Sequence, residues 1–197
     1  MRTFRHSPND KIWFTSDLHF GHDKEFVWRA RGFSSVDEMN ETLIENINKK
    51  VKEDDYLYIL GDFALCPIDE ARYWISKINC QNVILIIGNH DTDARLQLYE
   101  DNGFTVQFAG RLRYGKYHFF LSHYPTLTAN EGEDKLSLAF INLYGHSHQT
   151  TWAADHSQFA FNVGVDAHLC EPIEINSIIS FLKGKLFLQK FDNFELI

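Results

Sequence analysis

Residues 83–91 read Val-Ile-Leu-Ile-Ile-Gly-Asn-His-Asp, a short apolar run with an abrupt polar ending. Val83–Ile87 is apolar at every position, which predicts a strand that is buried on both faces. Such strands belong to parallel sheets that helices cover. Gly88–Asp91 then supplies an amide, an imidazole and a carboxylate directly after the strand. Because ligands of open α/β sheets bind at the carboxyl ends of the strands, these residues mark a candidate functional site.

Helical patterns separate the predicted strands in the first half of the chain, and β-rich runs dominate the second half. A capping box at Ser35–Glu38 begins a helix whose apolar stripe runs over Met39–Val51. Further helices are expected over residues 67–78 and 92–103. Other strands are predicted at Ile12–Thr15, Tyr56–Leu60, Phe104–Phe108, Tyr117–Ser122, Phe140–Tyr144, Phe159–Val163 and Lys185–Phe191. We therefore expect a layered α/β domain with sheets inside and helices outside.

Length and composition fit a single globular domain over residues 1–197. The chain is 44% hydrophobic and 15% aromatic, which is enough apolar material for a full core. Its formal charge of −8 argues against a surface built mainly to bind nucleic acid, although bound cations can reverse the charge locally. The 3 cysteines are scattered, which favours a reducing, cytoplasmic location. No apolar run approaches ~18 residues, so we expect no membrane span.

Side chains that bind metals or transfer protons follow five of the predicted strands. Each one alone has an ordinary explanation as a cap, a turn or a satisfied polar residue. Together they imply convergence on one pocket, because the alternative needs several independent coincidences at one edge of the sheet. The set offers carboxylates, imidazoles and an amide but no thiolate, which suits Mn, Fe, Zn or Ni in a catalytic centre of up to two ions. Its members are Asp17, His19, Asp62, Asn89, His90, His123, His146 and His148.

The order D-x-H, G-D, G-N-H-D, an isolated His and G-H-x-H resembles the motifs of the calcineurin-like metallophosphoesterase superfamily. The match runs from Asp17 to His148, and the later stretch FNVGVD at Phe161–Asp166 is similar to small bacterial and phage members. The resemblance implies a layered αββα sandwich, in which two central mixed sheets are flanked by helices. It also implies two divalent ions, with Mn favoured over Fe, Zn or Ni. The implied reaction is hydrolysis of a nucleotide-like or other small phosphodiester by a hydroxide that bridges the ions.

The resemblance further assigns a role to each residue of the motifs. One ion would be held by Asp17, His19 and His148, and the second by Asn89, His123 and His146. Asp62 would bridge the two ions, and His90 would act at the leaving group as the catalytic residue. Candidate substrate contacts outside the motifs are His22, Arg31 and His168. Asp91 is expected to fix the G-N-H-D turn rather than to bind metal.

One departure from the superfamily narrows the reaction. Ser/Thr protein phosphatases continue the second motif as GDxxDRG, whereas Leu65 stands here in place of the second Asp and no Arg follows. This disfavours protein phosphatase activity and favours a phosphodiesterase. A nuclease, a phosphomonoesterase and a scaffold without catalysis remain alternatives. The complete ligand set disfavours the scaffold, and the negative charge disfavours the nuclease despite a small basic cluster at Arg111, Arg113 and Lys116. The expected partner is a small phosphoester, with no membrane partner and with nucleic acid possible but not favoured.

Overall fold

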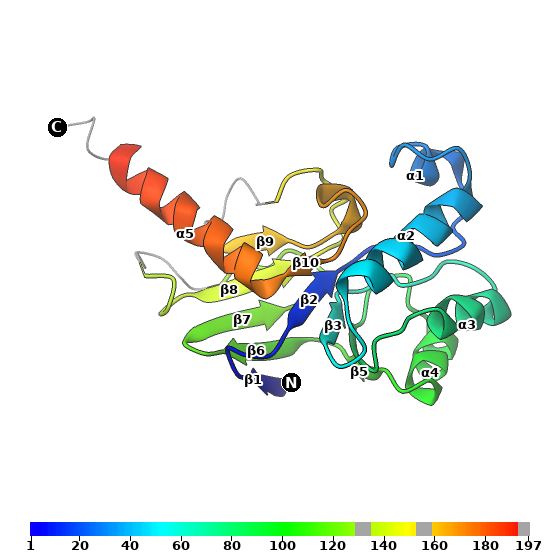
Figure 1. Ribbon diagram of the computed structural model, residues 1–197, viewed down its shortest axis with the longest axis horizontal. Helices are drawn as coiled ribbons and strands as arrows, with labels where there is room; N and C mark the ends of the chain where they lie inside the picture. The colour runs from blue at the N-terminus through cyan, green and yellow to red at the C-terminus, as the bar shows by residue number, and fades with distance from the viewer. Residues whose placement is uncertain (129–134, 153–158, 193–197) are drawn as a thin grey trace.

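Two five-stranded mixed sheets form the centre of the fold (Figure 1). Sheet I has the strand order β1-β6-β7-β8-β9, and sheet II has the order β10-β2-β3-β4-β5. The computed structural model describes residues 1–128, 135–152 and 159–192. Its elements are β1 (Arg2–His6), β2 (Ile12–Thr15), α1 (Glu25–Trp28), α2 (Val36–Lys50), β3 (Tyr56–Ile59), α3 (Ile68–Ser76), β4 (Asn82–Ile86), α4 (Asp93–Asp101), β5 (Thr105–Gln107), β6 (Gly110–Tyr114), β7 (Tyr117–Leu121), β8 (Phe140–Tyr144), β9 (Ala160–Asn162), the 3-10 turn η1 (Val165–Ala167), β10 (Ile173–Glu174) and α5 (Ile175–Asp192).

Strand direction brings several carboxyl ends to one edge of the molecule. In sheet II, strands β2 to β5 are parallel to one another, and only β10 runs antiparallel to β2. In sheet I, β7, β8 and β9 are parallel, while β6 is antiparallel to β7. Parallel strands need crossover connections, and α2, α3 and α4 supply them in sheet II. The loops that leave β2, β3 and β4 therefore emerge together.

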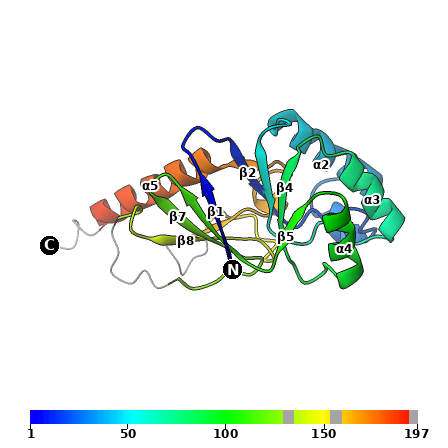
Figure 2. The same cartoon turned by 90° about the horizontal axis from the view of Figure 1, so that it is seen from below.

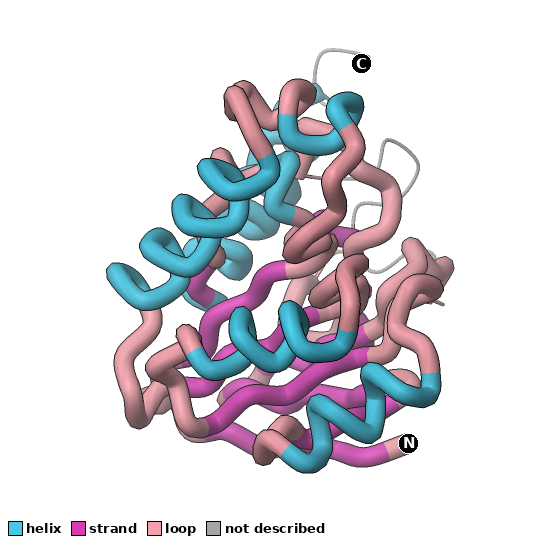
Figure 3. The backbone as a smooth tube through the Cα atoms, turned by 90° about the vertical axis from the view of Figure 1, so that its right-hand side faces the viewer, coloured by secondary structure: helices cyan, strands magenta, loops and turns pink. Residues whose placement is uncertain are grey.

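Alternating side chains of sheet II face two separate apolar layers. In β4, Ile84 and Ile86 join the core between the sheets, whereas Val83 and Leu85 join the core under α2, α3 and α4. This arrangement explains why the strand reads as a continuous apolar run and confirms that both of its faces are buried. Truncating Leu85, which is fully buried, to Ala would cost about 2–5 kcal/mol of stability. Figure 3 shows the helices in front of the strands when the molecule is seen from this side.

The predicted helix starts agree with the local hydrogen bonds. Ser35 is the N-cap of α2, and its side chain accepts a 3.1 Å hydrogen bond from the Glu38 amide. The Glu38 carboxylate accepts from the Ser34 amide at 2.7 Å, one residue earlier than the ideal capping box would have it. Helix α4 begins after Thr92 as expected, although the Thr92 side chain makes no cap hydrogen bond.

The strand predicted at Lys185–Phe191 is wrong, because these residues belong to helix α5. The apolar stripe that decides this begins earlier, at Ile175, Ile178, Ile179 and Leu182, all of which are buried in the core between the sheets. Spacings of three and four residues indicate a helix. Figure 2 shows α5 running along one side of β7 and β8. Among the described helices, none is both long and apolar enough to cross a bilayer.

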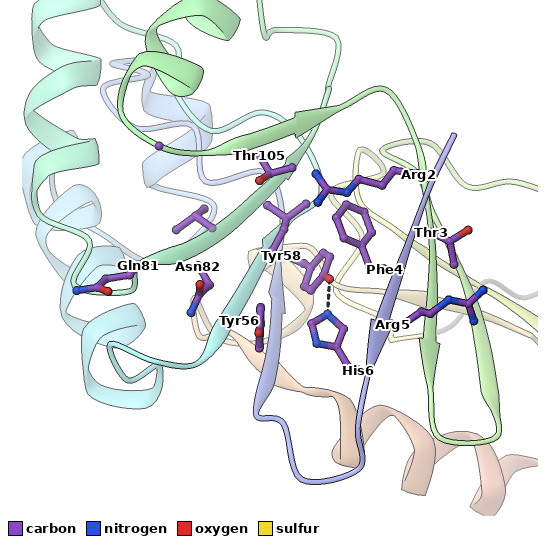
Figure 4. Close-up of a pocket in the computed structure, with 13 residues that line it drawn as sticks. Arg2, Thr3, Phe4, Arg5, His6, Tyr56, Tyr58, Gln81, Asn82 and Thr105 are labelled. Carbon is purple, nitrogen blue, oxygen red and sulfur yellow. Dashed lines mark hydrogen bonds between the residues drawn. The ribbon is translucent and has the colours of Figure 1, made fainter.

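Strands β1 and β6 are additions to the predicted set. They pair in parallel at the end of sheet I, with Phe4 opposite Leu112. A hydrogen bond of 2.7 Å between His6 Nε2 and the hydroxyl of the buried Tyr58 ties β1 to sheet II (Figure 4). The pocket of about 380 Å³ in this view lies beside the first residues of β3 and β4, at the opposite end of these strands from the predicted ligands.

Candidate metal centre

The predicted ligands come together where five strands end. Asp17 and His19 follow β2, and Asp62 follows β3. Asn89 follows β4, His123 follows β7, and the G-H-x-H histidines follow β8. Sheet II thus supplies four of these side chains and sheet I supplies the other three, so the site spans the line where the two sheets meet.

Asp62 lies at the centre of the group. Its Oδ2 atom is 3.6 Å from His19 Nε2 and 3.5 Å from His123 Nε2. Its Oδ1 atom accepts a 2.9 Å hydrogen bond from the His90 amide, which fixes the carboxylate plane. The side chain is 2% exposed, so water does not compete for these contacts. One oxygen between two imidazoles is the arrangement that a bridging carboxylate needs.

Asp17, His19 and His148 form one potential cation site. Their ligand atoms all lie within 4.8 Å of one another. Both ring nitrogens of His19 are buried and have no hydrogen-bond partner among the described residues. Burial also lowers the pKa of His19 to about 2, so its imidazole is neutral and one of its two ring nitrogens keeps a free lone pair. Unpartnered buried nitrogen is costly, and a bound cation would remove that cost.

Asn89, His123 and His146 form a second group around the other side of Asp62. Asn89 Oδ1 lies 2.8 Å from His123 Nε2 and 2.9 Å from His146 Nδ1. His123 Nδ1 donates to the Leu60 carbonyl at 2.8 Å, which fixes the ring with Nε2 toward Asn89 Oδ1. An amide oxygen and imidazole nitrogens that converge in this way can coordinate one cation. The donor set therefore fits a metal ion of the kind that oxygen and imidazole ligands bind.

The backbone of the ligand loops is strained. Asp17, His19, Asp62, His146 and His148 have φ angles between 49° and 65°, in the left-handed region that non-glycine residues rarely adopt. These five residues make up most of the seven described non-glycine residues with positive φ. Such conformations cost about 1–3 kcal/mol each and persist only where the surrounding structure holds them. Here they turn successive side chains inward toward one point.

Glycines of two motifs permit the close approach of these loops. A Cβ atom on Gly61, which has a φ of 95°, would overlap the imidazole of His123. A Cβ atom on Gly145 would overlap Ser16 Oγ and come within 2.5 Å of Asp17 Oδ2. Any side chain at either position would therefore displace a ligand, which explains the glycine of G-D and of G-H-x-H in physical terms.

Asp166 and Arg31 support the first cation site from behind. Asp166 Oδ2 accepts a 2.8 Å hydrogen bond from His148 Nδ1, and this contact raises the pKa of His148. Although burial opposes its ionisation, the His148 contact and the charge of Arg31 hold the pKa of Asp166 well below its usual range. The guanidinium of Arg31 also donates to the Asp17 carbonyl at 2.7 Å. A carboxylate behind a ligand imidazole orients that ring and strengthens it as a ligand.

Two of the candidate substrate contacts hold other protein groups. Arg31 lines a pocket together with His22 and His90. Its side chain is 2% exposed and donates to Asp166, Asp17 and Leu18. His168 is buried behind the site, where its Nε2 lies 2.7 Å from the Asn162 carbonyl and its ring stacks on Phe161. In both cases an isolated polar residue is satisfied within the protein.

Asp91 agrees with its expected role in the G-N-H-D turn. Its Oδ2 atom accepts hydrogen bonds from the Gly88 amide at 2.8 Å and from the Asp62 amide at 2.9 Å. Its Oδ1 atom accepts from the Tyr99 hydroxyl at 3.2 Å. Asp91 thus joins the loop after β3 to the loop after β4 and sets the position of Asp62.

A pocket of about 500 Å³ opens beside the first cation site. His22 and His90 line it together with His19 and His148. Helix α1 and the turn after it supply an apolar wall of Phe26, Val27 and Ala30, which no motif of the sequence singles out. No motif identifies Asp166 as a ligand support either, although it ends the stretch FNVGVD that carries part of the resemblance.

Comparisons with known proteins agree with this geometry. A family model described as calcineurin-like phosphoesterase matches residues 10–170. The protein MJ1445 of Methanocaldococcus jannaschii is 32% identical over 148 residues, which cover 67% of this chain and 84% of that protein. The gene 66 protein of Mycobacterium phage L5 is 29% identical over 184 residues, which cover 79% of this chain and 86% of the phage protein.

A solved structure shares the fold. The protein AQ665 of Aquifex aeolicus aligns over 88% of this chain and 100% of its own, with a TM-score of 0.67 and 23% sequence identity. The family match confirms the resemblance found in the motifs, and the two mixed sheets flanked by helices agree with the fold that it implied. The chain belongs to the calcineurin-like phosphoesterase family.

Proposed function

We propose that this protein is a two-metal phosphodiesterase that hydrolyses a nucleotide-like or other small phosphodiester. Membership of the family makes it a metal-dependent phosphoesterase, and the proposal concerns the number of ions and the kind of ester. The observation that carries it is the position of Asp62 Oδ2, which is within 3.6 Å of an imidazole from each cation site. A site for a single ion has no use for a carboxylate in that position.

The donor set favours exchangeable divalent cations. Asp17, His19 and His148 would hold one ion, Asn89, His123 and His146 the other, and Asp62 both. Mn suits this mixture of oxygen and imidazole ligands, with Fe, Zn or Ni as alternatives. When bound, two such ions supply a nucleophile from water near neutral pH and neutralise the charge of the phosphoryl oxygens.

His90 is the residue best situated to act on the leaving group. It lines the pocket beside the first cation site, and its ring centroid is 5.4 Å from that of His19. Its backbone is held at both ends, because its amide donates to Asp62 and its carbonyl accepts from Arg95 at 3.0 Å. The imidazole makes no hydrogen bond to the described residues, so it is available to protonate the departing ester oxygen.

The wall of the pocket supports a diester over a monoester. Phe26, Val27 and Ala30 present apolar surface beside His90 and His148. A phosphodiester offers an organic group on each side of phosphorus, and one of them gains favourable burial against this wall. A monoester offers an extra charged oxygen there instead, which an apolar wall does not stabilise. His22, which also lines the pocket, would contact the substrate from the same side.

A substrate panel tests the proposal. Metal-free protein is supplied with Mn and assayed on phosphomonoesters, linear phosphodiesters and cyclic nucleotides. We expect diesters to be turned over faster than monoesters with the same leaving group. Faster turnover of monoesters would favour the phosphomonoesterase, and activity confined to polynucleotides would favour the nuclease. Hydrolysis of none of them would support the scaffold.

A further inference from the structure

One face of sheet I carries cations and aromatic rings, and the strand residues that form it include no carboxylate. In β1, β6 and β7, alternate residues such as Phe4, Leu112 and Phe119 point into the core between the sheets. The residues between them point the other way, away from sheet II and from α5, which both pack on the core side. Figure 4 shows Thr3 and Arg5 on the side of β1 opposite to Phe4 and His6. We call this surface the basic face; it comprises Thr3, Arg5, Arg111, Arg113, His118, Phe120 and Phe140.

Strand register places two arginines of the basic face side by side. Arg5 lies opposite Arg113, and the imidazole of His118 is next in the row. Adjacent strands are about 4.8 Å apart, so these side chains are direct neighbours. Like charges in cross-strand positions destabilise a sheet. None of the described ion pairs includes Arg5, Arg111 or Arg113, so the repulsion is not relieved within the part of the protein that the structure describes.

The charges of the whole chain make this concentration more unusual. The sequence has 27 acidic and 19 basic residues outside histidine, yet it contains no Asp or Glu between Asp101 and Glu131. The four strands that form the face, β1, β6, β7 and β8, contain no acidic residue. A net charge of −8 therefore hides a strong local segregation of charge. Such a field attracts anionic partners to one side of the molecule.

Aromatic rings lie among these cations. Phe140 is opposite His118 in the register, and the guanidinium of Arg111 sits 5.0 Å from the centre of the Phe140 ring. Phe120 lies beside Phe140, with 5.8 Å between the ring centres. A shallow hollow of about 250 Å³ runs between Arg5, Arg111 and Phe140. Cations at strand spacing beside half-buried rings combine phosphate binding with base stacking.

We propose that the basic face binds single-stranded nucleic acid. Arg5, Arg111 and Arg113 would contact successive phosphates, and Phe140 with Phe120 would contact the bases. The rings favour this partner over an acidic peptide or an anionic lipid surface, which need cations but no stacking platform. The proposal does not depend on the phosphodiesterase activity. The basic face is the side of sheet I that points away from the core between the sheets, and it includes none of the predicted metal ligands.

Fluorescence anisotropy with a labelled single strand of about 12 nucleotides tests the proposal, with chelator present so that no hydrolysis occurs. If three arginines each neutralise one phosphate, the logarithm of the binding constant should fall with the logarithm of the salt concentration with a slope of about −2. This slope corresponds to an affinity loss of about 20-fold between about 50 and 200 mM salt. Arg111→Ala should lower the slope by about 0.7. The double variant Arg111→Glu/Arg113→Glu should abolish binding, whereas Arg72→Glu, an exposed cation on α3, should leave it unchanged.

Stacking has its own signature. Phe140→Leu should weaken binding about 5-fold or more while leaving the salt slope unchanged, since a ring contact releases no counterions. Circular dichroism would verify that this variant keeps its fold. Failure of the wild-type protein to bind at low salt would overturn the proposal, as would equal binding by the double variant. Two results would show that the partner is a different polyanion. One is competition by polyglutamate as effective as that of nucleic acid at the same charge. The other is binding to phosphatidylserine vesicles that depends on the arginines and is as strong as binding to the single strand.

Discussion

Replacing Asp166 with Asn should weaken metal binding without changing any of the predicted metal ligands. Asp166 touches no predicted ion position, but its Oδ2 atom accepts from His148 Nδ1 at 2.8 Å and its Oδ1 atom accepts from Arg31 Nε at 2.9 Å. Asn keeps the shape and one acceptor but loses the charge. Loss of such a support residue typically costs 10–100-fold in metal affinity, which is about 1.4–2.7 kcal/mol for one ion. The second ion, held on the far side of Asp62, should keep its affinity.

The pH dependence adds a sharper test. The carboxylate raises the pKa of His148, so it strengthens the ring as a ligand and also favours the proton that competes with the metal. In the variant the pKa of His148 falls, and proton competition moves to lower pH. The affinity difference between wild type and Asp166→Asn should therefore be largest near pH ~8 and narrow near pH ~6, below the ordinary histidine value.

Calorimetric titration of chelator-treated protein with Mn measures both affinities at the two pH values. Asp69→Asn, which removes an exposed carboxylate from the first turn of α3, is the matched control. Equal affinities for wild type and Asp166→Asn at the higher pH would refute the reasoning. Loss of both ions together would also refute it, because Asp166 would then support the loops in general. Asp166→Ala, which removes the only carboxylate that pairs with the buried Arg31 among the described residues, should lose about 3–5 kcal/mol of unfolding free energy.

Three further perturbations test the centre itself. Chelation should abolish hydrolysis of an aryl phosphodiester and Mn should restore it; full activity after verified metal removal would contradict the proposed chemistry. Asp62→Asn should reduce metal occupancy and turnover together, because its Oδ2 atom is within 3.6 Å of both imidazoles, and normal turnover with two ions bound would exclude a bridge. His90→Ala should retain both ions and lose about 10²–10⁴-fold in kcat on esters with poor leaving groups, but much less on nitrophenyl esters. If one ion is missing from His90→Ala and excess Mn restores the rate, His90 is a ligand.

The sequence was most informative where one local pattern allowed one structure. The apolar run at Val83–Ile87 and the capping box at Ser35 each predicted an element within one or two residues. The position of each ligand directly after a strand was enough to predict that the ligands meet around Asp62, because the carboxyl ends of parallel strands lie at the same edge of a sheet. Lys185–Phe191 misled because a short apolar window does not separate period 2 from period 3.6, and the deciding residues Ile178 and Ile179 lie before it.

Residues that act through another residue were the hardest to predict. Asp166 supports His148 from eighteen positions further along the chain, and Arg31 reaches Asp166 across 135 positions. Neither contact leaves a periodic or compositional trace, because the contacts depend on how η1 packs against the loop after β8 and against the segment between α1 and α2. From the sequence, Arg31 is a charged residue in a loop, whereas in the fold its guanidinium donates hydrogen bonds to Asp166, Asp17 and Leu18. Second-layer contacts of this kind follow from tertiary packing and not from local sequence.

The strain in the ligand loops shows how fold and chemistry depend on each other. Asp17, His19, Asp62, His146 and His148 hold left-handed backbone conformations that each cost about 1–3 kcal/mol. Buried strands on both sides of the site hold these loops in place, since residues such as Ile59 and Leu143 next to them are fully buried. The scaffold thus fixes the direction of the ligand side chains, which reduces the ordering cost that opposes ion binding. A protein without a metal role would gain several kcal/mol by relaxing these five residues, which makes the strain itself an argument that the loops are built to hold cations.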